Sequence, residues 1–167
     1  MASLYQARRD NPFHISVGAV VVNGEGKILV HKREKHAAPL PFQSEFLDRN
    51  EIYILARETV EDDESLEQAV LRGVAEEFGV AGRVEKYLGA RSLVITTGNP
   101  AWEWEKTTLY FQVTPIGEAE RVIDDESFSV LEWHDPDFLI ERMRGQGGKD
   151  RSDLDESKII ETYAKYA

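Results

Sequence analysis

The stretch from Glu58 to Val80 constrains the fold of this chain most strongly, because its second half has the features of one amphipathic helix. Ser65 and Gln68 have the spacing of a capping box, which satisfies free N–H groups at a helix start. Gly79 is placed to end the helix in the left-handed conformation. Apolar residues recur between them at steps of three and four, so one helix face should pack on a core.

The same helix carries charged residues beside its apolar face. Glu76 and Glu77 are adjacent carboxylates, and Arg72 lies one turn before Glu76, where the two can form an ion pair. Adjacent carboxylates at a buried edge repel each other unless a cation lies between them, and their oxygens suit Mg²⁺ or Mn²⁺. Gly73 lies on the same arc, at a cost of about 1 kcal/mol relative to alanine. A solvated helix face is the alternative that this pattern leaves open.

Composition narrows the classes of partner. The net charge of −11, from 20 basic and 31 acidic residues, disfavours diffuse binding to nucleic acid or an anionic membrane. A phosphorylated small molecule remains compatible, because a bound divalent metal can supply local positive charge. The absence of cysteine excludes disulfides and thiolate metal sites. Without a secretory signal or an apolar run of about 18 residues, we expect a cytoplasmic protein.

Strand patterns surround the helix and define one expected domain over residues 1–167. We expect a tail at 1–12 and a flexible loop at 145–153, which precedes a C-terminal helix at 154–166. The turn Asn23-Gly24-Glu25-Gly26 predicts an opening hairpin, and Asp135-Pro136 predicts the start of a further helix. These elements indicate a mixed α/β or α+β sandwich with helices packed on a sheet. The predicted strands cover 13–22, 27–33, 51–57, 83–97, 102–115 and 128–133.

Two groups of residues outside the helix are candidates for substrate binding. Arg33, in a basic cluster at the end of the second strand, can bind phosphate in a bidentate manner. Trp102 and Trp104 are two residues apart in a strand and therefore share a face, where they could flank a nucleobase or a sugar. The alternatives are a charged strand end for Arg33 and a core or homodimer surface for the two tryptophans.

The stretch 58–80 resembles the sequence signature of the MutT-like Nudix hydrolases, the family that cleaves nucleoside diphosphates linked to another moiety. That signature is Gly, five residues, Glu, seven residues, Arg-Glu, an aliphatic residue, any residue, Glu-Glu, any residue, Gly and an aliphatic residue. The resemblance covers roughly residues 13–166 and implies an α/β/α sandwich with a mixed β-sheet. The matching residues here are Glu64, Arg72, Val74, Glu76, Glu77, Gly79 and Val80.

The signature is degenerate at two positions. Its opening glycine is Glu58, where the family usually has the end of a Leu-Pro-Gly-Gly run, and the glutamate after the arginine is Gly73. In the family, the carbonyl of that glycine and the helix glutamates typically hold metal ions. The glutamate that Gly73 replaces is often a metal ligand or the general base, so the resemblance supplies no base.

The resemblance implies roles for the matching residues. Glu76 and Glu77 are the expected metal ligands at the catalytic centre, and Arg72 and Glu64 are expected to brace the preceding loop against the helix. Family members often place a further acidic ligand or base in a downstream acidic loop, where Glu126 is the first choice. Weaker candidates for that role are Glu58, Glu61 and Asp125.

The implied function is metal-dependent hydrolysis of the pyrophosphate bond in a nucleoside diphosphate linked to another moiety. Such a reaction needs a cation to offset phosphoryl charge and a group that orients or deprotonates water. Mg²⁺ or Mn²⁺ is the expected cofactor, and a nucleotide-derived small molecule is the expected partner. The alternative, which Glu58 and Gly73 favour, is a catalytically impaired Nudix-fold module that binds nucleotides or regulates another protein.

Overall fold

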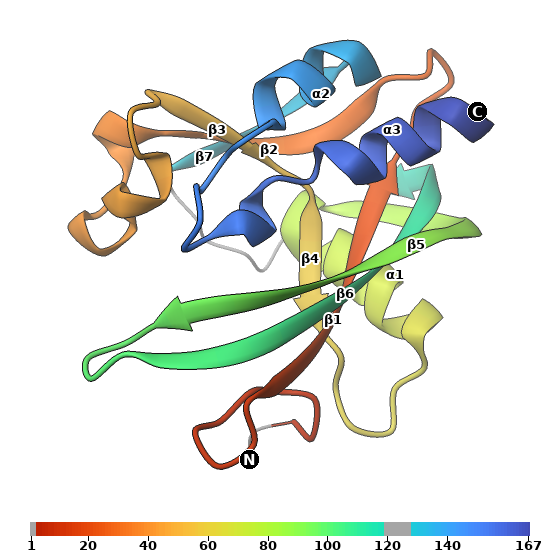
Figure 1. Ribbon diagram of the computed structural model, residues 1–167. Coiled ribbons are helices and arrows are strands. Elements are labelled where there is room, and N and C mark those ends of the chain that lie inside the picture. The colour runs from red at the N-terminus through yellow and green to blue at the C-terminus, as the bar shows by residue number, and fades with distance from the viewer. Residues whose placement is uncertain (1–2, 119–127) are drawn as a thin grey trace.

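The computed structural model describes residues 3–118 and 128–167 (Figure 1). Within these residues, the strands and α-helices follow the predicted order, and short 3₁₀ helices lie at Lys35–Ala37, Leu40–Phe46 and Ser152–Leu154. The elements are β1 (Phe13–Val21), β2 (Ile28–Glu34), β3 (Glu51–Ile54), β4 (Ala56–Thr59), α1 (Leu66–Phe78), β5 (Val80–Thr97), β6 (Trp102–Glu118), β7 (Ser129–His134), α2 (Pro136–Met143) and α3 (Ser157–Tyr166).

The strands form two sheets (Figure 1). The larger sheet has the order β4-β1-β6-β5 and is mixed, because β1 runs parallel to β6 while its other pairs are antiparallel. The smaller sheet has the order β3-β2-β7 and is antiparallel. Helix α1 packs on β1, β4 and β5, whereas α2 and α3 pack against each other. This is the mixed α+β sandwich that the sequence predicts.

The prediction of an opening hairpin is wrong about which strands pair. The turn forms, since the Gly26 N–H donates to the Asn23 carbonyl over 3.0 Å. The strands on its two sides, however, belong to different sheets, and in the described residues their ladder pairing is limited to an isolated bridge between Val22 and Ile28. β1 is instead a central strand of the larger sheet: its two edges pair with β4 and β6, and it has buried side chains on both faces.

The single strand predicted at 51–57 is likewise divided between the two sheets. β3 ends at Ile54 in the smaller sheet, Leu55 is fully buried at the crossing, and β4 begins at Ala56 in the larger sheet. β4 pairs antiparallel with β1, which places Glu58 opposite Val17. The crossing therefore brings residues 57 and 58 against α1, which also contacts β4.

Helix α1 has the predicted ends and the predicted buried face. The Ser65 hydroxyl accepts from the Gln68 N–H, the Gln68 amide accepts from the Ser65 N–H, and Gly79 ends the helix with a φ of 66°. The apolar face packs on the larger sheet and removes hydrocarbon from water, which stabilises the fold. Its buried side chains are Ala69, Val70, Val74 and Phe78.

The other face of the larger sheet carries a second core that includes residues of α2 and α3. Tyr110 on β6 is buried there, and a Cβ at Gly18 would lie 2.5 Å from its ring, so β1 needs a glycine at this point. None of the helices in the described parts of the chain combines the length and hydrophobicity needed to cross a bilayer.

The chain before β1 lies along the loop that precedes α1. The Ser3 hydroxyl donates to the Val60 carbonyl over 2.5 Å, and the Leu4 N–H donates to the Asp62 carboxylate over 2.7 Å. Tyr5 packs against the core under α1. These contacts hold one side of the acidic loop.

Candidate active site

Glu77 lies in the last turn of α1 and is fixed against two other elements. Its Oε2 accepts a hydrogen bond of 2.8 Å from the backbone N–H of Arg57 on β4. Its Oε1 lies 3.6 Å from Nε2 of His31 on β2, a buried ring nitrogen with no hydrogen-bond partner in the described structure. Glu77 therefore links the helix to both sheets.

Arg72 joins the acidic loop to the helix. Its Nε and Nη2 donate to the two carboxylate oxygens of Glu64 over 2.7 and 3.1 Å, and Nη2 also donates to the Thr59 carbonyl over 2.8 Å. On the helix side, its Nη1 lies 3.3 Å from Oε2 of Glu76. The bidentate pair braces the loop, and the guanidinium holds Glu76 in place.

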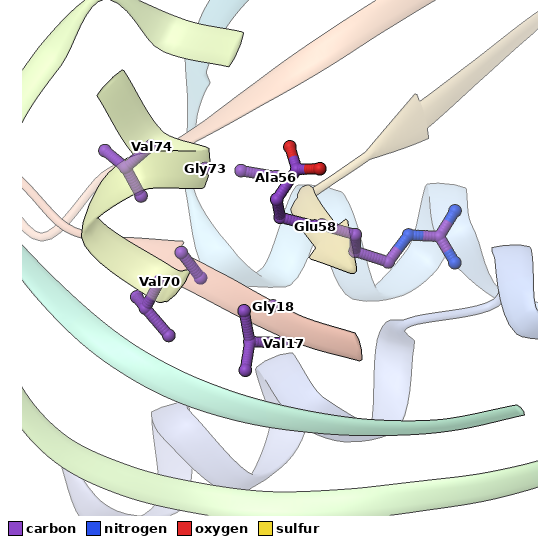
Figure 2. A pocket seen from close by; sticks show the side chains of 9 residues that line it. Val17, Gly18, Ala56, Glu58, Val70, Gly73 and Val74 are labelled. Carbon is purple, nitrogen blue, oxygen red and sulfur yellow. The ribbon is translucent and has the colours of Figure 1, made fainter. Parts of the chain in front are cut away.

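Glu58 occupies the space beside the helix glycine (Figure 2). A Cβ added at Gly73 would lie 2.9 Å from the Glu58 Cβ, closer than real Cβ atoms approach other heavy atoms. The Glu58 carboxylate lies 3.5 Å from Nη1 of Arg72. Burial raises the pKa of the Glu58 carboxyl to about 7, and Arg72 opposes this shift. The negative charges of Glu77 and Glu76 add to the rise.

Replacing Gly73 by alanine should lower the free energy of unfolding by about 1–3 kcal/mol, the usual cost of overpacking. Helix propensity alone predicts the opposite, a gain of about 1 kcal/mol. The Glu58 Cβ causes the loss, so the same change in a Glu58→Gly background should be stabilising. Urea denaturation of the four proteins measures both effects. A stabilising Gly73→Ala in the wild-type background would contradict the packing described here.

The carboxylates of Glu58, Glu76 and Glu77 fit a divalent metal by the chemistry of their oxygen donors. The stem of the Glu58 side chain fills the space beside Gly73. In the described residues, however, no three His, Cys, Asp or Glu side chains already converge as a metal-binding group. Nη1 of Arg72 lies 3.5 Å from the Glu58 carboxylate and 3.3 Å from the Glu76 carboxylate, so the guanidinium already pairs with both groups. Glu126 and Asp125 lie outside the described residues.

A cavity of ≈ 510 Å³ opens beside Glu58. This volume is in the range of small-molecule sites. Its walls are polar and largely acidic, so an anionic ligand could enter only together with a cation. The lining residues are Ser3, Gln6, Glu58, Thr59, Glu61 and Asp62.

The predicted substrate-binding residues lie on two other elements. Arg33 follows His31 by two residues on β2 and so shares its face; Nη1 of Arg33 lies 3.6 Å from Oε2 of Glu45. Trp102 and Trp104 lie on β6 with ring centroids 6.1 Å apart, as a stacked pair. The structure thus places Arg33 along the face of β2, in the smaller sheet, that reaches Glu77, and the tryptophan pair on β6 of the larger sheet.

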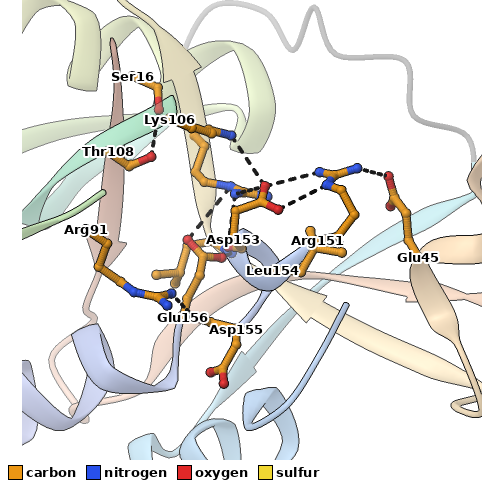
Figure 3. A network of polar contacts seen from close by, with 12 residues as sticks. Ser16, Glu45, Arg91, Lys106, Thr108, Arg151, Asp153, Leu154, Asp155 and Glu156 are labelled. Carbon is orange, nitrogen blue, oxygen red and sulfur yellow. Dashed lines mark hydrogen bonds and ion pairs between the residues drawn. The ribbon is translucent and has the colours of Figure 1, made fainter. Parts of the chain in front are cut away.

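Sequence reasoning missed a cluster of buried charges around Asp153 (Figure 3). Asp153, which is almost fully buried, accepts from Arg57 Nη1 and from Arg151 Nη2, each over 3.1 Å. Lys106 Nζ lies 3.6 Å from the same carboxylate. Arg57 connects this cluster to Glu77: its backbone N–H donates to the Glu77 carboxylate, and its guanidinium donates to Asp153. Its members come from distant chain segments, so only the unusual Arg57, at a position where the family usually has glycine, could have indicated it.

Lys106 has a strongly shifted pKa in this cluster. Its side chain is 14 % exposed, and burial lowers the pKa of the ammonium to about 8. The positive charge of the neighbouring Arg57 contributes to this lowering of the pKa, whereas Asp153 opposes it. The folded protein therefore holds this charge at a cost near neutral pH.

Replacing Lys106 by methionine should raise the free energy of unfolding at pH 7 by up to about 3 kcal/mol. An unfolded lysine titrates near about pH 10.4, so between about pH 8 and that value the unfolded chain binds more protons and wild-type stability rises with pH. The gain should be full below pH 8 and vanish as the pH approaches 10.4. Urea denaturation across this range tests it, with Lys158→Met at an exposed position of α3 as control. A gain in stability that does not change with pH would show that the lowered pKa of Lys106 is not its cause.

Comparison with known proteins identifies a family. The sequence model of the NUDIX domain matches residues 12–154. The fold resembles a NUDIX hydrolase from Nitrosomonas europaea, with a TM-score of 0.63, 19% identity and coverage of 91% of this chain and 88% of that one. It also resembles the MutT protein from Methanosarcina mazei Go1, with a TM-score of 0.54, 18% identity and coverage of 91% and 93%. A third similar structure is a UDP-X diphosphatase, with a TM-score of 0.54, 16% identity and coverage of 92% of this chain and 64% of that one. No curated protein matches the sequence.

Proposed function

Because this chain belongs to the Nudix family, and is thereby a pyrophosphohydrolase of that type, we propose that it hydrolyses the pyrophosphate bond of a nucleoside diphosphate linked to another moiety, with Mg²⁺ or Mn²⁺ as cofactor. One observation carries the proposal: the two adjacent carboxylates of α1 have separate anchors. The Arg57 N–H holds Glu77, and Arg72 holds Glu76. Both side chains are therefore positioned before any ligand binds, which is the preorganisation that catalysis requires.

The metal, when bound by Glu76 and Glu77, would offset the negative charge of the pyrophosphate oxygens. This chain's own residues orient those ligands. Arg72 is tied to the loop through Glu64 and the Thr59 carbonyl, so the loop and the helix hold a fixed spacing. Glu126 is our candidate for the group that activates water, on the basis of the resemblance of its loop.

The remaining parts of the substrate would contact Arg33 and the tryptophan pair. Arg33 carries a planar guanidinium suited to a phosphate oxygen pair. Trp102 and Trp104 offer aromatic faces for a base or a sugar. Support for a nucleotide-derived substrate comes from the family, and support for the Arg33 contact comes from its placement on the face of β2 that reaches Glu77.

A substrate panel tests the proposal. The purified protein is incubated with NDP-sugars, dinucleoside polyphosphates, ADP-ribose and (deoxy)NTPs, with Mg²⁺ or Mn²⁺, and the products are separated by ion-exchange chromatography. We expect a nucleoside monophosphate from at least one diphosphate derivative, and complete loss of turnover in EDTA. Turnover that persists in EDTA would refute the metal dependence. Tight nucleotide binding without turnover would favour the alternative of a binding module.

A further inference from the structure

We propose that two buried carboxylates of the C-terminal segment act as positioning residues for Glu77, through the side chain of Arg57. These carboxylates belong to Asp153 and Glu156. The inference rests on the proposed function for the reaction that Glu77 serves. It gives a role to an arginine at a position where the family usually has glycine, and to a segment that lies far from α1 in the sequence.

The first argument concerns the edge of the larger sheet. β4 is an edge strand, and in the described residues its ladder pairs only with β1. The N–H of Arg57 donates to the Glu77 carboxylate over 2.8 Å, so a side chain of α1 accepts where a further strand could have paired. This peptide group fixes one oxygen of Glu77. A shift of β4 at residue 57 would therefore move the carboxylate.

The second argument is that the side chain of the same residue is tied to the C-terminal segment (Figure 3). Nη1 of Arg57 donates to the Asp153 carboxylate over 3.1 Å and to the Asp153 backbone carbonyl over 3.2 Å. Its Nε lies 3.8 Å from Oε2 of Glu156. The Arg57 side chain is only 12% exposed, so water competes little for these contacts. Arg57 thus links Glu77 to residues 153–156.

The third argument is that Glu156 holds the crossing between β3 and β4 at a second point. Its side chain is fully buried, and Oε1 accepts from the Leu55 N–H over 2.9 Å. Its Oε2 accepts from the Tyr110 hydroxyl over 2.6 Å, which ties the carboxylate to β6 of the larger sheet. The C-terminal segment therefore holds residues 55 and 57 together. Two attachment points fix the orientation of this stretch of backbone as well as its position.

The competing explanation is that the charge cluster only stabilises the fold. Arg151 separates the two explanations, because it pairs with the same Asp153 carboxylate over 3.0 and 3.1 Å but joins it to Glu45 rather than to β4. A purely stabilising cluster predicts that loss of either arginine lowers stability and leaves kcat of the folded protein unchanged. Positioning predicts that only the loss of Arg57 lowers kcat.

Steady-state kinetics of folded variants, checked by circular dichroism, measure this difference. Arg57→Met keeps the backbone N–H and should lower kcat at least about tenfold with KM within about threefold, because a misplaced catalytic group slows the reaction without weakening uniform binding. Arg57→Lys keeps the charge and should recover part of the loss. Arg151→Met should keep kcat within about threefold of the wild type. Equal kcat values in Arg57→Met and Arg151→Met would overturn the positioning role.

Amide hydrogen exchange, followed by NMR, gives a readout that needs neither ligand nor activity. Asp153→Asn is made in a Lys106→Met background, which removes one of the cations facing Asp153 and so keeps the net charge of the cluster. Compared with Lys106→Met alone, the Arg57 amide should exchange at least about tenfold faster, while the β1 amides that pair with β6 keep their rates. In Arg151→Met, the Arg57 amide should stay within about threefold of the wild type.

The two measurements separate this inference from the proposed function. An unchanged Arg57 exchange rate in the Asp153→Asn protein, with a wild type that hydrolyses its substrate, would overturn the inference and leave the function intact. A wild type that turns over no substrate, while Asp153→Asn accelerates exchange at Arg57, would overturn the function and leave the link between Arg57 and the C-terminal segment intact.

Discussion

Replacing Glu77 by glutamine should lower kcat/KM for a nucleoside diphosphate derivative by about a hundredfold or more, while the protein stays folded. Glutamine keeps a carbonyl oxygen that can accept from the Arg57 N–H, so the 2.8 Å anchor to β4 is preserved. What disappears is a negative charge at the carboxylate that joins α1 to both sheets. The loss in activity should therefore greatly exceed the loss in stability.

Steady-state kinetics with saturating Mg²⁺ and urea denaturation of the same preparation separate the two effects. Glu67→Gln is the matched control, because it makes the same chemical change on an exposed turn of the same helix. A kcat/KM close to that of the wild type would show that Glu77 has no part in the reaction, and the catalytic assignment of the helix carboxylates would have to be abandoned.

Helix α1 could be predicted because its determinants are local. The capping box, the left-handed Gly79 and the pair between Arg72 and Glu76 each involve residues at most four positions apart or a single backbone angle. Such features depend little on the rest of the chain. The structure contains all of them at the expected residues.

The division into two sheets could not be predicted in the same way. The turn at Asn23 determines where the chain reverses, but partners more than thirty residues away determine which strands pair. β1 pairs with β4 on one edge and with β6 on the other, and both of its faces are buried, one under α1 and the other in the core that includes α3. Sequence periodicity indicates which side chains share a face of a strand, but it does not indicate which strand pairs with each of its edges.

The candidate site shows the same limit. The pairing of Arg72 with Glu64 follows from the resemblance, whereas the contact of Glu58 with Gly73 depends on how the chain crosses between sheets before β4. The unexplained helix glycine was the one sequence signal for that contact. No sequence signal of comparable strength indicates the charge cluster around Asp153, because Arg57, Lys106 and Asp153 meet only in the folded chain.

Replacing Arg72 by methionine should lower the free energy of unfolding by about 3–5 kcal/mol at pH 7, the usual cost of removing one partner from a largely buried ion pair. The change leaves the Thr59 carbonyl without its donor and four carboxylates without their shared cation. Arg72 also lowers the pKa of Glu64, so the stability from this pair is present above the unfolded value of about 4.3 and is lost as the pH falls below it. The four carboxylates belong to Glu58, Glu61, Glu64 and Glu76.

Urea denaturation at pH 7 and below pH 4, with Arg72→Lys as the intermediate variant, tests this account. Lysine keeps the charge but cannot form the bidentate contact with Glu64, so its loss should fall between those of the wild type and the methionine variant. Mg²⁺ should restabilise Arg72→Met more than the wild type, because the cation no longer competes with a guanidinium for Glu76. If Mg²⁺ stabilises both proteins equally, Arg72 and the metal do not share this carboxylate, and the site must bind its cation elsewhere.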